Sequence, residues 1–435
     1  MQKSHNFDKL INDKMKVEEI NMSKKLKGAA LLGQSGGPTS VINASAAGVF
    51  LEALAQEDIT QVYGAKHGIK GILNEELYDI NQEDKNELEL LKYTPSSAIG
   101  SVRYKLADYK KDSTDYYRLL EVFKKYNIRY FFYNGGNDSM DTCLKISKFM
   151  KDSGWECRVM GVPKTIDNDL AGIDHSPGYA SAAKYVATSI MELYLDATVY
   201  DTQQFILVEI MGRNAGWLTA AASLATLGGA KIDLMYLPEV PFDFDLFLEQ
   251  VGEKLKTGKT VFAVVSEGVK TKEGKYIPEL EAEMKKDSFG HAHLGGTASI
   301  LADHVADKYG VKVRAIEFSL LQRSAAHLAS LTDINEAYRV GQLAVRKAVN
   351  GSTNKFVGIT RVEGDKYKVK YPLLPLKIVA NAERKVPEEW ILPNGQGISD
   401  EYIKYALPLI QGETKLKKEN GLPRFAKLKK VLVKK

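Results

Sequence analysis

A short polar segment in the middle of the chain combines groups that can act on a charged substrate. Pro163–Asp169 carries a lysine, a threonine and two aspartates directly after the apolar run Arg158–Val162. The run predicts a buried strand, and because proline cannot extend the strand's ladder, the polar residues should emerge at its carboxyl end. Ligands bind at that edge in open α/β sheets. If the backbone stays extended, Asp167 and Asp169 point the same way, one suited to a proton and the other to a metal ion. The alternative is an Asx-rich turn whose side chains bond only the backbone.

A glycine turn near the start of the chain has the features of an anion site. The predicted strand Ala29–Leu32 runs into Gly36 and Gly37, and a helical pattern follows over Val41–Ala55. Successive N–H groups in such a turn, with the amino end of a helix behind them, bind anions without a charged side chain. Glycine also serves ordinary tight turns, so a simple turn remains the alternative.

A second glycine turn carries oxygen ligands as well. The predicted strand Ile128–Tyr133 ends in a turn that contains Asn137 and Asp138, and a helix follows through Met150. Amide and carboxylate oxygens suit a hard cation such as Mg²⁺. The alternative is that Asp138 or Ser139 only caps the helix.

A basic loop between these two turns offers a further phosphate contact. Arg103 stands close to Gly100 and Ser101, where a guanidinium could reach a phosphate. A surface position for Arg103 is the alternative.

The elements that must position these loops alternate along the chain. A helical pattern over Gly178–Tyr194 precedes the strand Phe205–Ile210, after which a glycine and a cation stand in Met211-Gly212-Arg213. Further strands are predicted at 232–237, 260–265, 311–316 and 356–362, with helices at 242–256, 298–309 and 334–349. This order predicts parallel sheets joined by right-handed crossovers, in a three-layer α/β architecture. A chain of 435 residues exceeds the size of a single core, so we expect two domains.

Composition excludes several classes of protein. The chain is 44% hydrophobic and 26% charged, as in ordinary globular proteins, and its net charge of +5 does not indicate a nucleic-acid partner. No apolar run is long enough for a membrane span, and the charged arm Met1–Lys27 lacks the apolar centre of a signal peptide. Two cysteines without metal or disulfide spacing fit a reducing compartment, so we expect a cytoplasmic protein.

The ordered set of loops resembles a 6-phosphofructokinase from about Gly28 to Val362. The segments that carry the resemblance are Gly36-Gly37, Gly100–Arg103, Gly135–Ser139, Pro163–Asp169, Met211–Arg213, Glu267 and Gln322-Arg323. It implies a phosphofructokinase-like fold of two α/β domains with the active site in the cleft between them, and we expect a homo-oligomer. By similarity, residues 28–177 plus 323–371 form the phosphoryl-donor domain. Residues 178–322 plus 372–435 form the fructose 6-phosphate domain and tail, after the arm 1–27.

The resemblance also implies a role for each site residue. Asp167 accepts the proton of the sugar's 1-hydroxyl, Thr165 positions that hydroxyl, and Arg213 contacts the transferring phosphoryl oxygens. Mg²⁺ is the implied cofactor, with Asn137 and Asp169 as its ligands. Gly36, Gly37 and Arg103 belong to the donor side, while the sugar contacts besides Thr165, Asp167 and Arg213 are Met211, Gly212, Glu267, Gln322 and, for the 6-phosphate, Arg323.

Two departures from the ATP-dependent pattern resemble the pyrophosphate-dependent branch of the family. Asp138 stands where ATP-using relatives have glycine, and Lys164 precedes the threonine of the catalytic segment. A carboxylate at Asp138 would repel a nucleotide's α-phosphate, while the Lys164 ammonium would favour compact pyrophosphate. We therefore assign Asp138 and Lys164 to the catalytic residues and to the diphosphate-binding residues. Asn137 replaces the usual aspartate, and Gln204 and Leu320 replace substrate contacts of many relatives.

The leading hypothesis is reversible phosphoryl transfer from pyrophosphate to fructose 6-phosphate, giving fructose 1,6-bisphosphate and phosphate. One alternative is the ATP-dependent enzyme. Another is a catalytically silent sugar-phosphate-binding homologue, which the replacements at Asn137, Gln204 and Leu320 would suit. The presence of Asp167 argues against silence, because a binding protein needs no proton acceptor.

Overall fold

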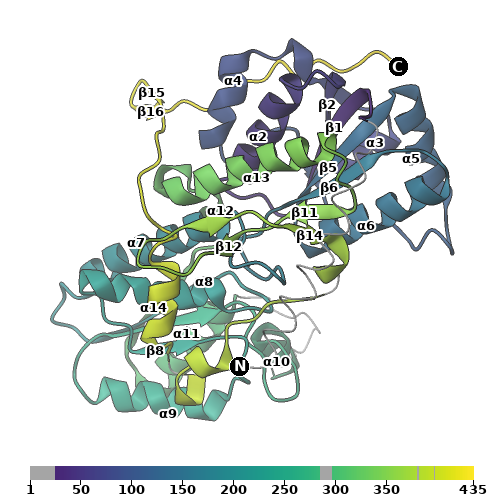
Figure 1. Ribbon diagram of the computed structural model, residues 1–435. Helices are drawn as coiled ribbons and strands as arrows, with labels where there is room; N and C mark the ends of the chain where they lie inside the picture. Colours follow the sequence, from purple (N-terminus) through teal and green to yellow (C-terminus); the bar gives the residue numbers. More distant parts are fainter. Residues whose placement is uncertain (1–24, 285–295, 380–381, 396) are drawn as a thin grey trace.

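The protein folds as two α/β domains joined by several crossings of the chain (Figure 1). The computed structural model describes residues 25–284, 296–379, 382–395 and 397–435. Most of the predicted arm 1–27 therefore lies outside the described residues. Of its last three residues, Leu26 packs against the core of the domain that follows.

The large-sheet domain contains the first six strands together with two later ones. In the described chain the order across the sheet is β14-β11-β6-β5-β1-β2-β3, with β4 paired to the end of β1. Neighbours are parallel except at the two edges, where β3 and β14 run antiparallel. The strands are β1 (Gly28–Ser35), β2 (Ile59–Ala65), β3 (Leu77–Asp79), β4 (Ser101–Val102), β5 (Ile128–Gly135), β6 (Arg158–Pro163), β11 (Lys355–Val357) and β14 (Leu373–Pro375).

Helices cover both faces of this sheet, as the side chains of β5 show. Phe131 and Tyr133 face a core built with α3, α5 and α6, whereas Tyr130 and Phe132 face a core built with α2 and α13. Successive strand residues point to opposite faces, so a strand that is apolar throughout requires cover on both. The helices are α2 (Ile42–Leu54), α3 (Gly68–Leu73), α4 (Lys85–Leu90), α5 (Thr114–Lys125), α6 (Asn137–Asp152) and α13 (Leu331–Val349).

The small-sheet domain repeats this three-layer plan around parallel strands in the order β10-β7-β9-β8. Phe205 and Leu207 of β7 face one core, and Ile206 and Val208 face the other. Its strands are β7 (Gln204–Ile210), β8 (Leu234–Tyr236), β9 (Val261–Ser266) and β10 (Lys312–Glu317). Its helices are α7 (Tyr179–Ala197), α8 (Trp217–Ala220), α9 (Phe244–Leu255), α10 (Ile277–Met284), α11 (Thr297–Tyr309), α12 (Leu321–Ser324) and α14 (Asp400–Ala406).

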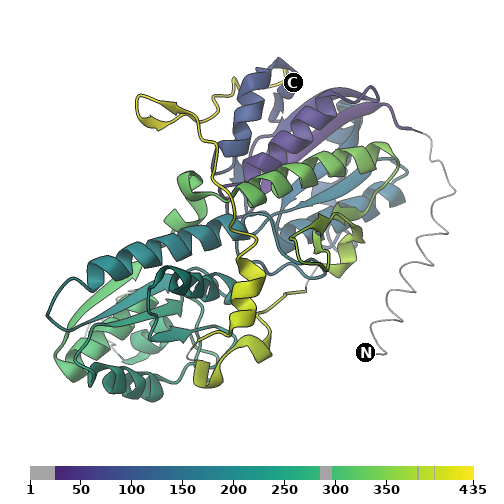
Figure 2. The same ribbon diagram turned by 60° about the vertical axis from the view of Figure 1, so that its left-hand side comes forward.

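The carboxyl-terminal segment does not follow the predicted division at residue 371. β14 completes the edge of the large sheet, because its adjacent side chains Leu373 and Leu374 pack into the cores on opposite faces. Residues around α14 then join the small-sheet core through Tyr402 and Leu409. The last segment, yellow in Figure 2, returns to the large-sheet domain, where Leu432 forms a bridge with Tyr78 of β3.

The described elements otherwise match the predicted alternation of strands and helices, including a fold with mainly parallel sheets. Small paired strands β12 (Thr360–Arg361) with β13 (Val369–Lys370) and β15 (Lys418–Glu419) with β16 (Leu422–Pro423) lie in the later connections. None of the helices in the described ranges combines the length and apolarity that a membrane crossing needs.

Candidate active site

The predicted catalytic segment lies at the carboxyl end of β6, but its backbone is not extended. Asn168 adopts φ +55°, a left-handed turn between Asp167 and Asp169. Its buried side chain accepts a hydrogen bond from the Ser176 N–H at 2.9 Å and donates one to the Tyr405 hydroxyl at 2.8 Å. The condition of an extended backbone, under which Asp167 and Asp169 would point the same way, is therefore not met. Asn168 is a turn residue, as the alternative held, but its side chain bonds the Tyr405 hydroxyl as well as the backbone. The aspartates on either side of it both line a cavity.

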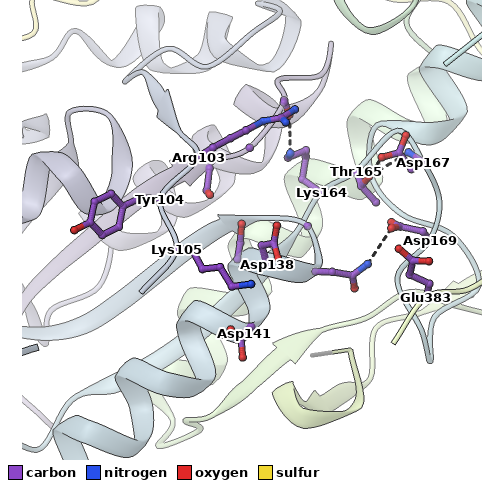
Figure 3. Close-up of a pocket in the computed structure, with 16 residues that line it drawn as sticks. Arg103, Tyr104, Lys105, Asp138, Asp141, Lys164, Thr165, Asp167, Asp169 and Glu383 are labelled. Carbon is purple, nitrogen blue, oxygen red and sulfur yellow. Dashed lines mark hydrogen bonds between the residues drawn. The ribbon is translucent and has the colours of Figure 1, made fainter. Parts of the chain in front are cut away.

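This cavity has a volume of about 450 Å³ and lies where the carboxyl ends of β1, β5 and β6 meet (Figure 3). Such an edge is where parallel α/β sheets bind ligands. Its lining residues are Ser35, Gly36, Gly37, Arg103, Tyr104, Lys105, Gly136, Asn137, Asp138, Ser139, Asp141, Lys164, Thr165, Asp167, Asp169 and Glu383. The structure thus brings every predicted donor-side and metal-ligand residue into one cavity.

Lys164 is the buried cation of the cavity, with only 4% of the residue exposed. Its Nζ donates a hydrogen bond to the Gly37 carbonyl at 2.6 Å, which ties the catalytic segment to the first glycine turn. Burial lowers the pKa of Lys164 to about 8, while nearby Asp167 acts in the opposite direction. An anion entering the cavity would restore the charge balance that burial disfavours.

Asp138 and Arg103 line the same cavity and are both exposed. Asp138 is in the first turn of α6, whose N-cap residue is Gly136. In the described chain no side chain caps this helix, so the capping alternative for Asp138 and Ser139 is not realised. Asp138 therefore presents an exposed carboxylate to a ligand that enters the cavity near the amino end of α6.

Asn137 and Asp169 form a contact that joins the second glycine turn to the catalytic segment. Asn137 Nδ2 donates to Asp169 Oδ2 at 2.9 Å, which leaves Asn137 Oδ1 buried with no hydrogen-bond partner in the described structure. Burial, followed by the charge of Asp167, raises the pKa of Asp169 to about 7. A cation bound here would give Asn137 Oδ1 a partner and would reduce the repulsion between Asp167 and Asp169.

Thr165 and Asp167 are paired within the segment. The Asp167 N–H donates to Thr165 Oγ1 at 3.1 Å, and the Thr165 hydroxyl lies 3.4 Å from Asp167 Oδ2. Burial raises the pKa of Asp167, which makes its carboxylate a better proton acceptor than a solvated aspartate.

The predicted sugar contacts from the second half of the chain gather at the ends of β7 and β9, outside the lining of this cavity. The Gly212 N–H is 3.4 Å from Glu267 Oε1, and the Met211 N–H donates to Gln322 Oε1 at 3.2 Å. Burial raises the pKa of Glu267, and Asp167 adds to the rise. The two groups of residues are thus close enough to interact electrostatically.

Arg323 connects this second group with the cavity, and Arg213 adds a second cation beside Glu267. Arg323 lies so near the first glycine turn that a Cβ added at Gly37 would be 2.5 Å from its Nη1. Arg213 is exposed, and its charge, like that of Arg323, acts to lower the pKa of Glu267. Arg323 therefore spans from α12 to the donor-side loop.

The structure adds lining residues that the sequence did not single out. Tyr104 and Lys105 directly follow Arg103, and Asp141 is one helical turn beyond Asp138. Their closeness to predicted site residues could have indicated them. Glu383 comes from the carboxyl-terminal segment, for which the sequence offered no signal. Gln204 is buried at the amino end of β7, where Nε2 donates to the Ala197 carbonyl, and it faces away from the site edge. Leu320 is exposed beside α12.

Two α/β domains with mainly parallel sheets, together with a cavity that combines two glycine turns, a buried lysine and two carboxylates, are the features expected of a phosphoryl-transfer enzyme. Residues 30–317 match the family described as Phosphofructokinase. The chain is 44% identical over 92% of its length to the pyrophosphate--fructose 6-phosphate 1-phosphotransferase of Halomonas elongata, covering 96% of that protein. It is 45% identical over 93% to the protein of the same name from Xanthomonas campestris pv. campestris, covering 97%.

A solved structure is similar to this protein over nearly the whole chain. The pyrophosphate-dependent phosphofructokinase of Nitrosospira multiformis superposes with a TM-score of 0.85 at 40% identity, covering 94% of this chain and 98% of that one. The chain belongs to the phosphofructokinase family.

Proposed function

We propose that this enzyme transfers a phosphoryl group from pyrophosphate to the 1-hydroxyl of fructose 6-phosphate, reversibly and with Mg²⁺. Relatives that match nearly the whole chain are named for this reaction. The single structural observation that carries the donor assignment is that buried Lys164 and exposed Asp138 line the same cavity. The ammonium attracts a compact, highly charged anion, whereas the carboxylate repels the additional phosphate of a nucleotide.

The acceptor half of the reaction is assigned to Thr165 and Asp167. Asp167 takes the proton of the sugar hydroxyl as that oxygen attacks phosphorus, and Thr165 orients the hydroxyl. Their hydrogen-bonded pairing and the raised pKa of Asp167 support these roles. Phosphoryl transfer depends mainly on alignment and charge neutralisation. Asp167 as a positioned base and Lys164 as a buried cation can together provide these two effects.

Magnesium fits the oxygen atoms present in the cavity. Asn137 Oδ1 is buried without a partner, and the Asp169 carboxylate lies beside the same side chain. Among the described residues no three His, Cys, Asp or Glu side chains converge on a metal position. Mg²⁺ sites in phosphoryl-transfer enzymes often use one or two protein ligands and complete their shell with phosphate and water. Bound Mg²⁺ would neutralise charge on the donor's oxygens, while Asn137 and Asp169 would hold it.

The sugar phosphate is assigned to the ends of β7 and β9. Glu267, Met211 and Gly212 are the proposed sugar contacts, with Gln322 supporting the backbone of Met211. Arg323 is proposed for the 6-phosphate and Arg213 for the transferring oxygens. The predicted cytoplasmic location and homo-oligomeric state stay predictions.

The donor assignment is tested by exchanging charge at Asp138. Wild type should use pyrophosphate much better than ATP, and Asp138→Gly should raise kcat/KM for ATP by about tenfold while lowering it for pyrophosphate. An exposed carboxylate is screened by water, so the repulsion it contributes is about one to two kcal/mol, or roughly tenfold. The measurement is kcat/KM for both donors at fixed fructose 6-phosphate and Mg²⁺.

Two further variants separate charge from shape in this assay. Asp138→Asn keeps the size of the side chain and should shift the donor ratio in the same direction. Asp152→Asn removes a carboxylate from the far end of the same helix, outside the cavity, and should leave the ratio unchanged. A wild type that prefers ATP, or a donor ratio that is insensitive to Asp138, would contradict the pyrophosphate assignment.

A further inference from the structure

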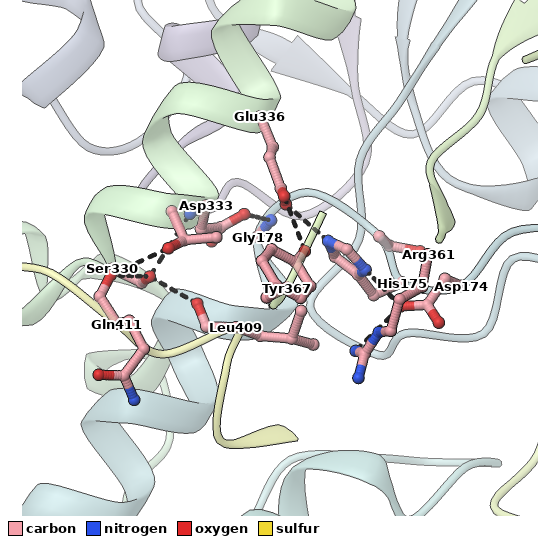
Figure 4. Close-up of polar contacts among 12 residues, drawn as sticks. Asp174, His175, Gly178, Ser330, Asp333, Glu336, Arg361, Tyr367, Leu409 and Gln411 are labelled. Carbon is pink, nitrogen blue, oxygen red and sulfur yellow. Dashed lines mark hydrogen bonds and ion pairs between the residues drawn. The ribbon is translucent and has the colours of Figure 1, made fainter. Parts of the chain in front are cut away.

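Beneath the catalytic segment lies a fully buried histidine that has no part in the roles assigned above. The ring nitrogens of His175 both face carboxylates, with Nδ1 2.8 Å from Asp174 Oδ2 and Nε2 2.6 Å from Glu336 Oε2 (Figure 4). A neutral imidazole has a single N–H and could donate to only one of them. With Asp174 and Glu336 both ionised, the two contacts require a protonated ring, which is a buried cation between two carboxylates.

The surroundings of His175 support this charge state. The Tyr367 hydroxyl donates to Glu336 Oε1 at 2.7 Å, and Arg361 Nη2 donates to Asp174 Oδ2 at 3.2 Å, so both carboxylates are held in place. Burial alone would lower the pKa of His175, but the hydrogen bonds to Asp174 and Glu336 raise it to about 9. The charged and titratable groups facing this cluster include Asp174, Glu336, Asp333, Arg361, Tyr367, Tyr371, Arg384 and Tyr405.

Helix α13 holds the segment around His175 at two points. Glu336 contacts the histidine, and Asp333, three residues earlier on the same helix, accepts hydrogen bonds from the N–H groups of Gly178 at 2.9 Å and Ser181 at 3.0 Å (Figure 4). Residues three apart project from the same side of a helix. α13 therefore fixes both the segment before α7 and the first turn of α7.

The residues on either side of His175 connect it to the cavity. The Ser176 N–H donates to Asn168 Oδ1 at 2.9 Å. The Asp174 carbonyl accepts a hydrogen bond from the Tyr405 hydroxyl at 2.8 Å, and that hydroxyl in turn accepts one from Asn168 Nδ2 at 2.8 Å. Asn168 is the turn residue between Asp167 and Asp169, so the hydrogen bonds of its side chain determine where those two carboxylates stand.

We propose that His175 is a positioning residue for phosphoryl transfer. As an imidazolium between Asp174 and Glu336, it anchors residues 174–176 to α13. Through Tyr405 and Asn168 it thereby sets the places of Asp167 and Asp169 in the cavity. The kinetic part of this inference rests on the proposed function, while the charge state of the ring does not. Losing the anchor should cost turnover more than substrate binding, because displacing reacting groups by about 1 Å can lower a rate by about 100-fold.

The charge state is tested by NMR on wild type labelled with ¹⁵N at histidine. The His175 signals, assigned by their loss in His175→Gln, should show both ring nitrogens protonated at pH 7.5. One unprotonated nitrogen at that pH would overturn the imidazolium. This result does not depend on which donor the enzyme uses.

A thermal unfolding series checks the same charge. A group whose pKa is raised by folding contributes stability that is complete below its ordinary pKa of 6.5 and is lost as pH rises through about 9. The Tm difference between wild type and His175→Gln should therefore be largest near pH 6.5 and should shrink towards pH 9.5. A difference that does not change with pH would contradict a charged ring.

The positioning role is tested by kinetics at a temperature where circular dichroism shows each variant folded. With whichever donor the wild type uses, His175→Gln should lower kcat by about 10- to 100-fold and change either KM by less than about threefold, as expected for misplaced reacting groups. Tyr367→Phe is the matched control, because it removes a hydrogen bond from the same Glu336 without touching the route to Asn168. It should lower Tm but leave kcat within about threefold.

A second variant covers the case in which His175→Gln does not fold. Tyr405→Phe removes the hydroxyl that joins Asn168 to Asp174, so it should lower kcat in the same way. Combined with His175→Gln, it should lower kcat by less than the product of the two single effects, because both act through one contact. Near wild-type kcat in a folded variant of either residue, or an equal kcat loss in Tyr367→Phe, would overturn the proposal.

Discussion

At the scale of single residues, one turn separates structural from chemical side chains. Asn168 is fully buried and has hydrogen bonds from both ends of its amide, whereas its neighbours Asp167 and Asp169 are only partly buried and face the cavity. The left-handed backbone at Asn168 turns the middle side chain inward. Asparagine tolerates this conformation better than most residues. The same segment thus provides its own anchor.

We expect Asp167→Asn to lower kcat by about two to four orders of magnitude, the usual effect of losing a positioned acid or base. The amide keeps the size of the side chain but cannot accept the hydroxyl proton. KM for both substrates should change much less, and the unfolding temperature should stay close to that of wild type. Steady-state kinetics with circular dichroism on the same sample provides the check, and a kcat near the wild-type value would remove Asp167 as the base.

At the scale of elements, the position of α13 depends on a close crossing with α2. A Cβ added at Gly341 would lie 2.1 Å from the Ser45 carbonyl oxygen, and one added at Gly48 would lie 2.1 Å from the Tyr338 carbonyl oxygen. Both obstacles are backbone atoms, so a side-chain rotation cannot relieve them. The two glycines let the helices approach, and α13 then presents Asp333 and Glu336 to the segment before α7.

Gly341→Ala should therefore lower the free energy of unfolding by about 1 to 3 kcal/mol, the usual range for overpacking a core. This sign is opposite to the helix propensity of alanine, which alone would stabilise an exposed helix by about 1 kcal/mol. Denaturant unfolding measures the change. Lys347→Ala on the exposed side of the same helix is the control and should stay within about 0.5 kcal/mol of wild type. A stabilised Gly341→Ala protein would show that the crossing can relax.

At the scale of the whole molecule, the site is assembled from segments far apart in the chain. The cavity is lined mainly by loops of the large-sheet domain, with Glu383 added from the carboxyl-terminal segment. Arg323 approaches the lining residue Gly37 from α12, a short helix of the small-sheet domain that packs against α7. Substrate contacts therefore depend on how the two domains are held together. The carboxyl-terminal segment strengthens the link between the domains through the ion pair of Arg424 with Glu87 of α4.

Arg323→Ala should raise KM for fructose 6-phosphate by about 10- to 100-fold, the value of a lost charge-assisted hydrogen bond. kcat at saturation should change less, because a guanidinium on a phosphate that does not react binds the ground state and transition state about equally. Initial rates over a matrix of both substrates separate the two KM values. Lys256→Ala, which removes an exposed cation at the end of α9, should change neither KM. An equal rise in the KM for pyrophosphate would show that Arg323 binds the donor, a role that its closeness to Gly37 also allows.

The sequence by itself determined the alternation of strands and helices and the loops at which chemistry is placed. Strand periodicity and glycine turns are local properties, so β1, β5 and β6 and the loops that follow them were predicted close to where they lie. The left-handed turn at Asn168, the lining role of Glu383 and the path of residues 372–435 were decided only by tertiary structure. Asn168 bonds Tyr405 across 237 positions of chain, and His175 bonds Glu336 across 161. Such contacts form where packed surfaces bring distant groups together, and local patterns carry no information about which groups those are.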